Sequence, residues 1–270
     1  MNRLRAIVQL RHADIKLEKK RCDLRRLALA AAARTDRRDF VAALRERPRA
    51  IVAEIKRASP SAGPLRPGCD AASRARAYAD GGAAALSVLT EQRHFCGSWQ
   101  DLRRAKDAAA IPVLCKDFVV DEYQIWQAAV HGADAVLLIV AALDDTQLVR
   151  FQRLCDDLVL AALVEVHDAL DVQRALAAQA RLIGLNNRDL ATFAVDTDTA
   201  IRLRTLIPAQ LPVVAESGYH SAAQLARVFE RGVDAVLMGE ALMRATEPQR
   251  HLRELMDACS HHDGRPAWSA

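Results

Sequence analysis

The 270-residue sequence has six cysteines but no CxxC pair among them. Cys22, Cys69, Cys96, Cys115 and Cys155, together with Cys259, are scattered without a repeating interval. Such scatter argues against a disulfide framework and against a structural zinc site. We therefore expect free thiols in the reducing environment of the cytoplasm and no bound metal.

Long apolar segments and nucleotide-binding glycine motifs are also missing. Residues 1–26 are dense in charge, and the apolar run 27–33 lies too deep and is too short for a signal peptide or a membrane span. Neither the dinucleotide fingerprint GxGxxG nor the phosphate loop GxxxxGK[ST] occurs. These absences predict no membrane association and weigh against a doubly wound nucleotide-binding sheet.

Positive charge is concentrated at the N-terminus. The net charge is +4, yet residues 1–50 carry 15 Lys and Arg against 6 Asp and Glu. Nucleic-acid binding is one interpretation, but no aromatic interleaving, zinc knuckle or helix-turn-helix signature accompanies the charge. We expect no nucleic-acid partner, and a solvated helix face instead. Leu10, Leu17, Leu24 and Leu27 have helical spacing and predict one or two amphipathic helices docked on the main domain.

The remaining chain alternates short runs rich in Val, Ile and Leu with stretches of helical periodicity, a pattern typical of βα units. The runs expected to be strands are 51–55, 84–89, 112–115, 134–140, 159–166, 182–186, 212–216 and 234–239. Eight strands close a (β/α)8 TIM barrel, and 270 residues suit a single one. We predict an N-terminal helical extension over 1–48, the barrel over 49–258 and a C-terminal tail over 259–270. An open doubly wound sheet is the rival architecture.

Glycines and a repeated heptapeptide support this division. Gly81, Gly132 and Gly232 each follow a helical stretch and precede a strand, where a residue tolerant of positive φ is commonly needed. The segments 131–137 (HGADAVL) and 231–237 (RGVDAVL) are near copies. They predict that the fourth and eighth βα units are structurally equivalent.

Charged residues occupy strand positions that face the barrel interior. In the first strand, Ala53 and Ile55 suit the helix layer, so alternation turns Glu54 and Lys56 inward. The same reasoning, applied at the other strand ends, adds Lys116, Glu165, Asn186 and Glu216. Burying several ions costs several kcal/mol each unless partners compensate. Because barrel enzymes carry their active sites at this face, we interpret the set as catalytic, with a structural salt-bridge network as the alternative.

Other strand ends are apolar and suggest an aromatic substrate group. Leu89, Leu137 and Ile139 end the second and fourth strands, and Phe95 and Phe118 follow in nearby loops. Together they predict a flat apolar slot at the barrel mouth.

Two further features, a long loop and a pair of glycine turns, fit a small anionic substrate. Residues 57–68 form a connection longer than usual, as lids often do. Glycine turns at Ser217-Gly218 and at Gly239 follow strands seven and eight, where barrels commonly bind phosphate. A solvated loop and ordinary turns remain the alternative interpretations.

With these residues identified, the sequence resembles the indole-3-glycerol-phosphate synthase family. The resemblance rests on IVAEIKRASPS (51–61), LSVLTE (86–91), CKDF (115–118), LVEV (163–166) and IGLNNRDL (183–190). Further matching segments are AESG (215–218) and GEALMR (239–244). It extends in order from about residue 5 to residue 255 and shows no departure at a catalytic position.

The resemblance implies a reaction and residue roles. Members of the family close the indole ring of 1-(2-carboxyphenylamino)-1-deoxyribulose 5-phosphate with loss of CO₂ and water, without a cofactor or metal. Lys116 would be the acid at the carbonyl oxygen, and Lys56 and Glu165 would share the later acid and base roles. The implied substrate-binding residues are Glu54, Asn186, Arg188, Glu216, Phe95, Phe118 and Leu190, and those for phosphate are Ser59, Ser217, Gly218 and Gly239.

Further expectations concern partners and rival functions. The partner is a small phosphorylated substrate, and the chain is a monomer or weak homo-oligomer. Side chains introduced at Gly218 or Gly239 are expected to intrude on the phosphate while leaving the fold intact. A Schiff-base aldolase is a rival, because strand-end lysines also capture carbonyl groups. A non-catalytic sensor of a phosphorylated ligand is the other alternative.

Overall fold

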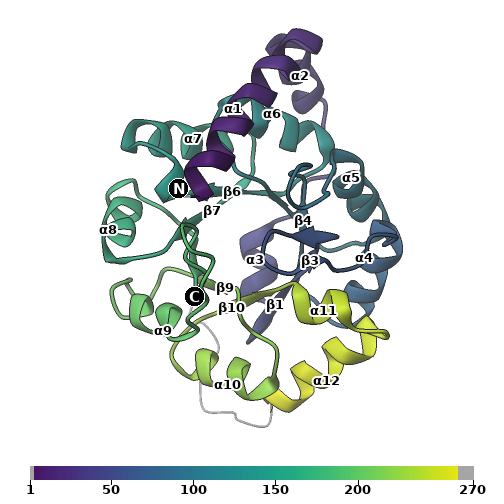
Figure 1. Cartoon of the computed structure of the whole chain (residues 1–270), viewed down its shortest axis with the longest axis vertical. Helices are drawn as coiled ribbons and strands as arrows, with labels where there is room; N and C mark the ends of the chain where they lie inside the picture. Colours follow the sequence, from purple (N-terminus) through teal and green to yellow (C-terminus); the bar gives the residue numbers. More distant parts are fainter. Residues whose placement is uncertain (1–2, 261–270) are drawn as a thin grey trace.

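A computed structural model describes residues 3–260 as a closed barrel of eight parallel strands with helices around it (Figure 1). The barrel strands are β1 (Ala50–Ile55), β4 (Ala85–Leu89), β5 (Val113–Lys116), β6 (Ala135–Ile139), β7 (Ala161–Val166), β8 (Ile183–Asn186), β9 (Val213–Glu216) and β10 (Ala235–Met238). Each pairs with its neighbour in the sequence, and β1 closes the ring against β10. The predicted TIM barrel is confirmed, which excludes the open sheet.

Helices connect the strands and precede the barrel. The connecting and C-terminal helices are α4 (Ala71–Asp80), α5 (Trp99–Ala108), α6 (Glu122–His131), α7 (Asp145–Asp157), α8 (Ala169–Ala177), α9 (Asp198–Arg204), α10 (Ala222–Glu230), α11 (Glu240–Arg244) and α12 (Pro248–Ser260), with a 3-10 turn η1 (Val140–Ala142). Most begin at an Asp or Ser whose side chain accepts a backbone N–H of the first turn, as Asp168 does for α8. Helix α12 includes the first two residues of the expected tail, and residues 261–270 lie outside the described part.

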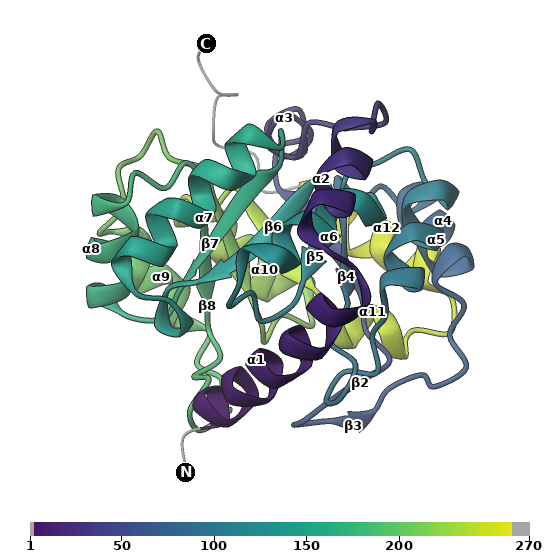
Figure 2. The ribbon, with the colours of Figure 1, turned by 90° about the horizontal axis from the view of Figure 1, so that it is seen from above.

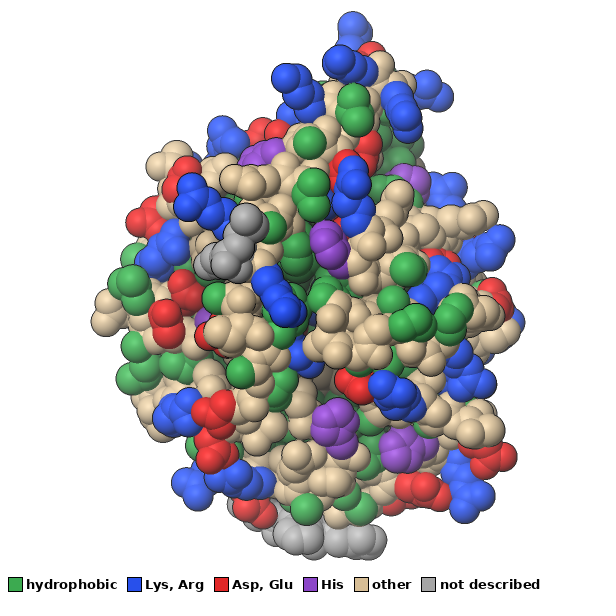
Figure 3. All heavy atoms as spheres, in the orientation of Figure 1, with side chains coloured by type: hydrophobic (Ala, Val, Ile, Leu, Met, Phe, Trp, Pro, Cys, Tyr) green, Lys and Arg blue, Asp and Glu red, His purple; other side chains and the backbone are tan. Residues whose placement is uncertain are grey.

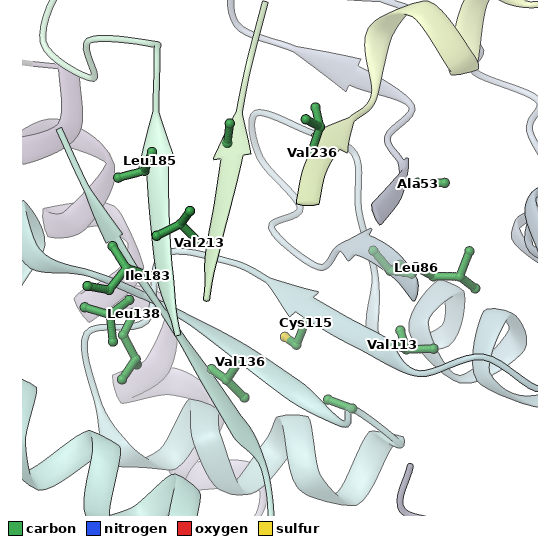
Figure 4. Close-up of a cluster of buried hydrophobic side chains, with 14 of the residues drawn as sticks. Ala53, Leu86, Val113, Cys115, Val136, Leu138, Ile183, Leu185, Val213 and Val236 are labelled. Atoms are coloured by element: carbon green, nitrogen blue, oxygen red, sulfur yellow. The ribbon is translucent and has the colours of Figure 1, made fainter. Parts of the chain in front are cut away.

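Apolar residues form two layers separated by the strands. Side chains such as Ala53 and Val236 pack outward against the helices, as predicted for Ala53 (Figure 4). Inward residues, among them Val52 and Leu163, fill the barrel with a second cluster. Toward the carboxyl ends this inner cluster continues on one side of the barrel through residues such as Leu137 and Ile139, whereas inward positions on other strands are polar.

The repeated heptapeptide adopts the same structure twice. Gly132 and Gly232 both have positive φ, 101° and 88°. Asp134 accepts the N–H of Val113 and Asp234 that of Val213, so each aspartate ties its strand's start to the preceding strand. The predicted equivalence is confirmed. The prediction for Gly81 is wrong, because the residue with positive φ after α4 is Gly82.

The N-terminal extension contains α1 (Arg3–Arg21), α2 (Leu24–Ala32) and α3 (Phe40–Arg45). Figure 2 shows α1 and the loop that follows β1 at one end of the molecule, and α3 at the other end. In the part of the chain that the structure describes, we find no helix long and apolar enough to span a membrane.

The predicted packing face of the extension is largely wrong. Leu10, Leu17 and Leu24 are 40, 54 and 46% exposed, and of the four leucines only Leu27 is buried. The buried row of α1 consists instead of Leu4, Ile7, Arg11 and Ile15. A search for apolar residues at helical spacing misses this row, because it includes Arg11. Arg11 is buried because it forms an ion pair.

Candidate active site

A pocket of about 470 Å³ opens at the carboxyl ends of the strands. Figure 3 shows this face of the molecule, hollowed near its centre. All residues predicted for the site line the pocket: Glu54, Lys56, Ser59, Phe95, Lys116, Phe118, Glu165, Asn186, Arg188, Leu190, Glu216, Ser217, Gly218 and Gly239. The charged residues that were predicted to face inward therefore converge on one pocket.

Lys116 at the end of β5 lies between two buried carboxylates. Its Nζ is 2.6 Å from Glu216 Oε2 and 3.4 Å from Glu165 Oε2. Burial disfavours the charged lysine, but the two glutamates outweigh this and raise its pKa. Lys116 is therefore held as a cation that can donate a proton only when the reaction creates a strong acceptor nearby.

The two glutamates respond differently to burial. For Glu165, burial is outweighed by the charges of Lys116 and His167, and the pKa falls to about 2. For Glu216, burial and the neighbouring charge of Glu165 exceed the effect of Lys116 and raise the pKa to about 7. Glu165 therefore keeps its charge, and Glu216 is the carboxylate that accepts a proton first.

A second ion pair lines the pocket at the carboxyl end of β1. Lys56 Nζ is 2.6 Å from Glu54 Oε1, which orients the lysine at the strand end. Glycines leave room for the buried carboxylates. A Cβ at Gly184 would collide with Glu216, and one at Gly239 would collide with Glu54. The absence of a side chain at these two glycines therefore makes room for the buried carboxylates.

The pocket is divided into a polar and an apolar side by the order of strands. Ser59, Ser217 and Gly239 follow β1, β9 and β10, which are consecutive in the barrel. Apolar residues come from β4, β5 and β6 and their loops on the other side; they are Leu89, Phe95, Phe118, Leu137 and Ile139. Phe95 and Phe118 lie with ring centroids 6.2 Å apart. The pocket can therefore hold a molecule with an aromatic end and an anionic end.

Buried carboxylates fix the two phenylalanines. Glu91 accepts the backbone N–H groups of residues 93, 94 and 95, which holds the turn that carries Phe95. Asp117 accepts the N–H of Phe118 and pairs with Arg11 of α1 at 3.1 Å. Helix α1 is thus tied directly to the residue between Lys116 and Phe118.

The long loop after β1 contains a small hairpin of β2 (Ala58–Ser59) and β3 (Gly63–Pro64). Arg57 anchors its base through an ion pair with Asp101 of α5. The Arg57 carbonyl also accepts the N–H groups of Leu65 and Arg66. Closure of this loop over a ligand stays a prediction.

The expectation for the two phosphate glycines is wrong in one respect. A side chain at Gly218, where φ is 89°, would meet Val195 and Thr197, and one at Gly239 would meet Glu54. Substitutions there would therefore disturb protein contacts and the Glu54–Lys56 pair, and not only a bound anion.

One segment that lines the pocket was not predicted from the sequence. After β8, Phe193, Val195 and Thr197 reach the pocket because the chain folds back through a bridge between Arg188 and Val195. Arg188 also donates to the carbonyl of Phe193. The apolar residues of this loop show no periodicity that could have marked them. Among residues 3–260, no group of three or more His, Cys, Asp or Glu side chains could hold a metal ion.

Two lysines, three carboxylates and an apolar wall at the mouth of a (β/α)8 barrel form a candidate active site of the barrel-enzyme class. The model of one protein family, described as indole-3-glycerol phosphate synthase, matches residues 4–255. The chain belongs to the indole-3-glycerol phosphate synthase family.

Individual relatives agree with this assignment. Indole-3-glycerol phosphate synthase of Mycobacterium avium (strain 104) is 45% identical over 258 residues, which cover 96% of this chain and 95% of the relative. The protein of the same name from Mycobacterium tuberculosis (strain ATCC 25618 / H37Rv) is 44% identical with the same coverage. Members of the family are enzymes of tryptophan biosynthesis, so the chain is a biosynthetic enzyme.

Solved structures of low identity share the fold alone. Thiamine phosphate pyrophosphorylase from Pyrococcus furiosus matches with a TM-score of 0.60 at 16% identity, over 81% of this chain and 98% of that chain. KGPDC from Streptococcus mutans matches with a TM-score of 0.62 at 13% identity, over 80% and 99% of the two chains. Both matches support the barrel and carry no information about substrate.

Proposed function

We propose that this chain is a carbon-carbon lyase that converts 1-(2-carboxyphenylamino)-1-deoxyribulose 5-phosphate to indole-3-glycerol phosphate. One observation carries the proposal: Lys116 extends from β5, on the apolar side of the pocket, to Glu216 of β9 on the polar side, and it also contacts Glu165. A substrate with an aromatic ring at one end and a phosphate at the other fits this division. Membership of the family points to the same reaction.

The substrate would lie with its ring against Phe95, Phe118 and Leu190. Its phosphate would lie at the ends of β1, β9 and β10, where Ser59, Ser217, Gly218 and Gly239 offer hydroxyl and backbone groups. Glu54, Asn186, Arg188 and Glu216 would contact the hydroxyls between the two ends. This orientation brings the ribulose carbonyl to the two lysines.

Ring closure would use Lys116. The ring carbon that bears the carboxylate attacks the carbonyl carbon, a C–C bond forms, and the carbonyl oxygen takes a proton from the Lys116 ammonium. CO₂ then leaves, and its bonding electrons restore the aromatic ring. The raised pKa of Lys116 keeps this proton in place until the oxyanion develops.

Dehydration would use Lys56 and Glu165. Expulsion of the new hydroxyl as water needs an acid, and formation of the indole double bond needs a base to remove a proton from the neighbouring carbon. Since Glu165 keeps its charge, we assign the base to Glu165 and the acid to Lys56. No step transfers electrons to a cofactor or requires a metal.

We also propose a cellular compartment and an oligomeric state for the enzyme. Six free cysteines suit a cytoplasmic enzyme, and we propose a monomer or weak homo-oligomer that binds neither nucleic acid nor membranes. A Schiff-base aldolase and a non-catalytic sensor are not favoured by the family assignment.

Incubation of the purified protein with the ribulotide tests the proposal. Indole absorbance and fluorescence should appear together with one equivalent of CO₂. Treatment with borohydride in the presence of substrate should trap no covalent adduct. A trapped adduct without indole formation would instead support the aldolase.

A further inference from the structure

His167 is the residue directly after β7, and its side chain contacts Glu165, the proposed base. Residues 165 and 167 are two apart and therefore share a face of the strand. His167 Nε2 lies 3.2 Å from Glu165 Oε1, whereas Lys116 approaches the other oxygen, Oε2. The two oxygens of Glu165 thus have different cationic partners, and only one of these partners is assigned to the chemistry.

Asp171 fixes the position of His167 from the first turn of α8. Its Oδ2 accepts the backbone N–H of His167 at 3.1 Å and lies 3.5 Å from His167 Nδ1. Asp168 caps the helix by accepting the N–H of Asp171. Arg174 approaches the other oxygen of Asp171 at 3.9 Å. The imidazole is therefore held between two carboxylates, each near one ring nitrogen.

The surrounding charges favour the protonated ring. Burial lowers the pKa of His167, but Asp171 and Glu165 outweigh it and raise the pKa to about 10. Asp189, in the loop after β8, is close enough to His167 for the two charges to interact. The ring is 13% exposed, so solvent screens these interactions little.

Glu165 faces a mixed set of groups inside the barrel. Lys116 from β5 attracts its charge, Asn186 from β8 offers a hydrogen bond, and Glu216 from β9 repels it. Lys116 lies closer to Glu216 than to Glu165, 2.6 Å against 3.4 Å. When Lys116 donates its proton to substrate, its attraction for Glu165 also ends. A second cation is then needed if Glu165 is to remain charged until dehydration.

We propose that His167 is a positioning residue that, as an imidazolium braced by Asp171, keeps Glu165 ionised and turns Oε2 toward the substrate through both chemical stages. The role rests on the proposed function of Glu165 as the base. His167 does not touch substrate, and it exchanges no proton in the cycle. Its contribution is to keep the Glu165 carboxylate charged and correctly oriented.

The first test needs no activity. Nitrogen-15 NMR of the imidazole groups follows the protonation of His167 in the intact enzyme. The signals of His167 are identified as those that are missing in His167→Asn. Both ring nitrogens should stay protonated above pH 8. Titration near pH 6.5, the ordinary value for histidine, would overturn the proposal whether or not the enzyme has the proposed function.

The second test is kinetic and uses His167→Asn, His167→Gln and Asp171→Asn. In His167→Asn we expect the ratio of kcat at pH 5.5 to kcat at pH 8 to fall at least about fivefold below the wild-type ratio, because Glu165 now accepts a proton in this range. KM should change less than about threefold. His167→Gln should recover part of kcat at pH 8 but not the pH ratio, and Asp171→Asn should shift the ratio in the same direction by less.

His131→Asn is the matched control. His131 stacks on Trp99 with ring centroids 5.1 Å apart and does not line the pocket. This variant should lose stability without a change in the pH ratio. Wild-type enzyme that forms no indole would refute the proposed function, whereas active variants at position 167 with the wild-type pH ratio would refute the role of His167.

Discussion

Replacement of Lys116 by methionine separates its electrostatic role from its volume. The variant removes the cation that lies 2.6 Å from Glu216 and 3.4 Å from Glu165 and leaves two buried carboxylates facing each other. With an effective dielectric of about 20, each lost attraction is roughly 5 to 6 kcal/mol, part of which the carboxylates recover by taking up a proton. Breaking a buried pair in this way typically costs about 3 to 5 kcal/mol.

The pH dependence of stability follows from the sign of the shift. In Lys116→Met the pKa of Glu216 rises further above its unfolded value, because burial and Glu165 now act unopposed. A carboxyl group with a raised folded pKa stabilises the protein at low pH and loses that contribution as pH rises between the unfolded and folded pKa values. Lys116→Met should therefore be less stable than wild type by about 3 kcal/mol at pH 8, and the gap should narrow toward pH 6.

Urea unfolding at the two pH values, followed by circular dichroism, measures these differences. The double variant Lys116→Met/Glu216→Gln removes the orphaned charge and should regain much of the stability at pH 8. Turnover in either variant should fall more than about a thousandfold, roughly 4 kcal/mol, while substrate binding persists. A deficit independent of pH, or a loss of turnover below tenfold, would refute the reasoning.

Three further predictions follow from single features. Gly239→Ala should weaken binding of substrate and inorganic phosphate and lower turnover, because its Cβ would displace Glu54 from Lys56; calorimetry and kinetics measure both effects. Activity should withstand EDTA, since lysines and carboxylates are the proposed catalytic groups, and restoration of lost activity by zinc or magnesium would contradict this. Val159→Gly should stabilise the chain by about 1 kcal/mol in urea unfolding, because this 67% exposed β-branched residue has a φ of 55° after α7.

Much of the barrel could be predicted because its strands obey a simple alternation. Each apolar run marks a strand, and the alternation along β1 and the residue after it separates Ala53 and Ile55 from Glu54 and Lys56. Charges at inward positions are costly in a packed barrel, so their occurrence at the strand ends of the sequence indicates a site. The predicted site residues follow from this physical argument together with the family resemblance.

Contacts made across long separations in the sequence could not be predicted in this way. The pocket residues Val195 and Thr197 depend on how the chain folds back after β8, which no periodicity encodes. His167 follows the strand rule, since it lies two residues beyond Glu165, but its significance depends on Asp171 in the next helix. A histidine near a strand end becomes informative only when its second partner is known.

Arg11 shows why the packing face of α1 was assigned to the wrong row. A helix rich in Lys and Arg is expected to keep its cations in water, so the sequence favours Leu10 and Leu17 as the residues of α1 that pack on the barrel. Asp117 reverses this preference, because burial raises its pKa to about 6 while the Arg11 charge opposes that rise. The ion pair compensates two desolvated charges at once and leaves Arg11 only 5% exposed. Since Asp117 lies between Lys116 and Phe118, the same pair that docks the extension also supports the strand end that carries the proposed acid.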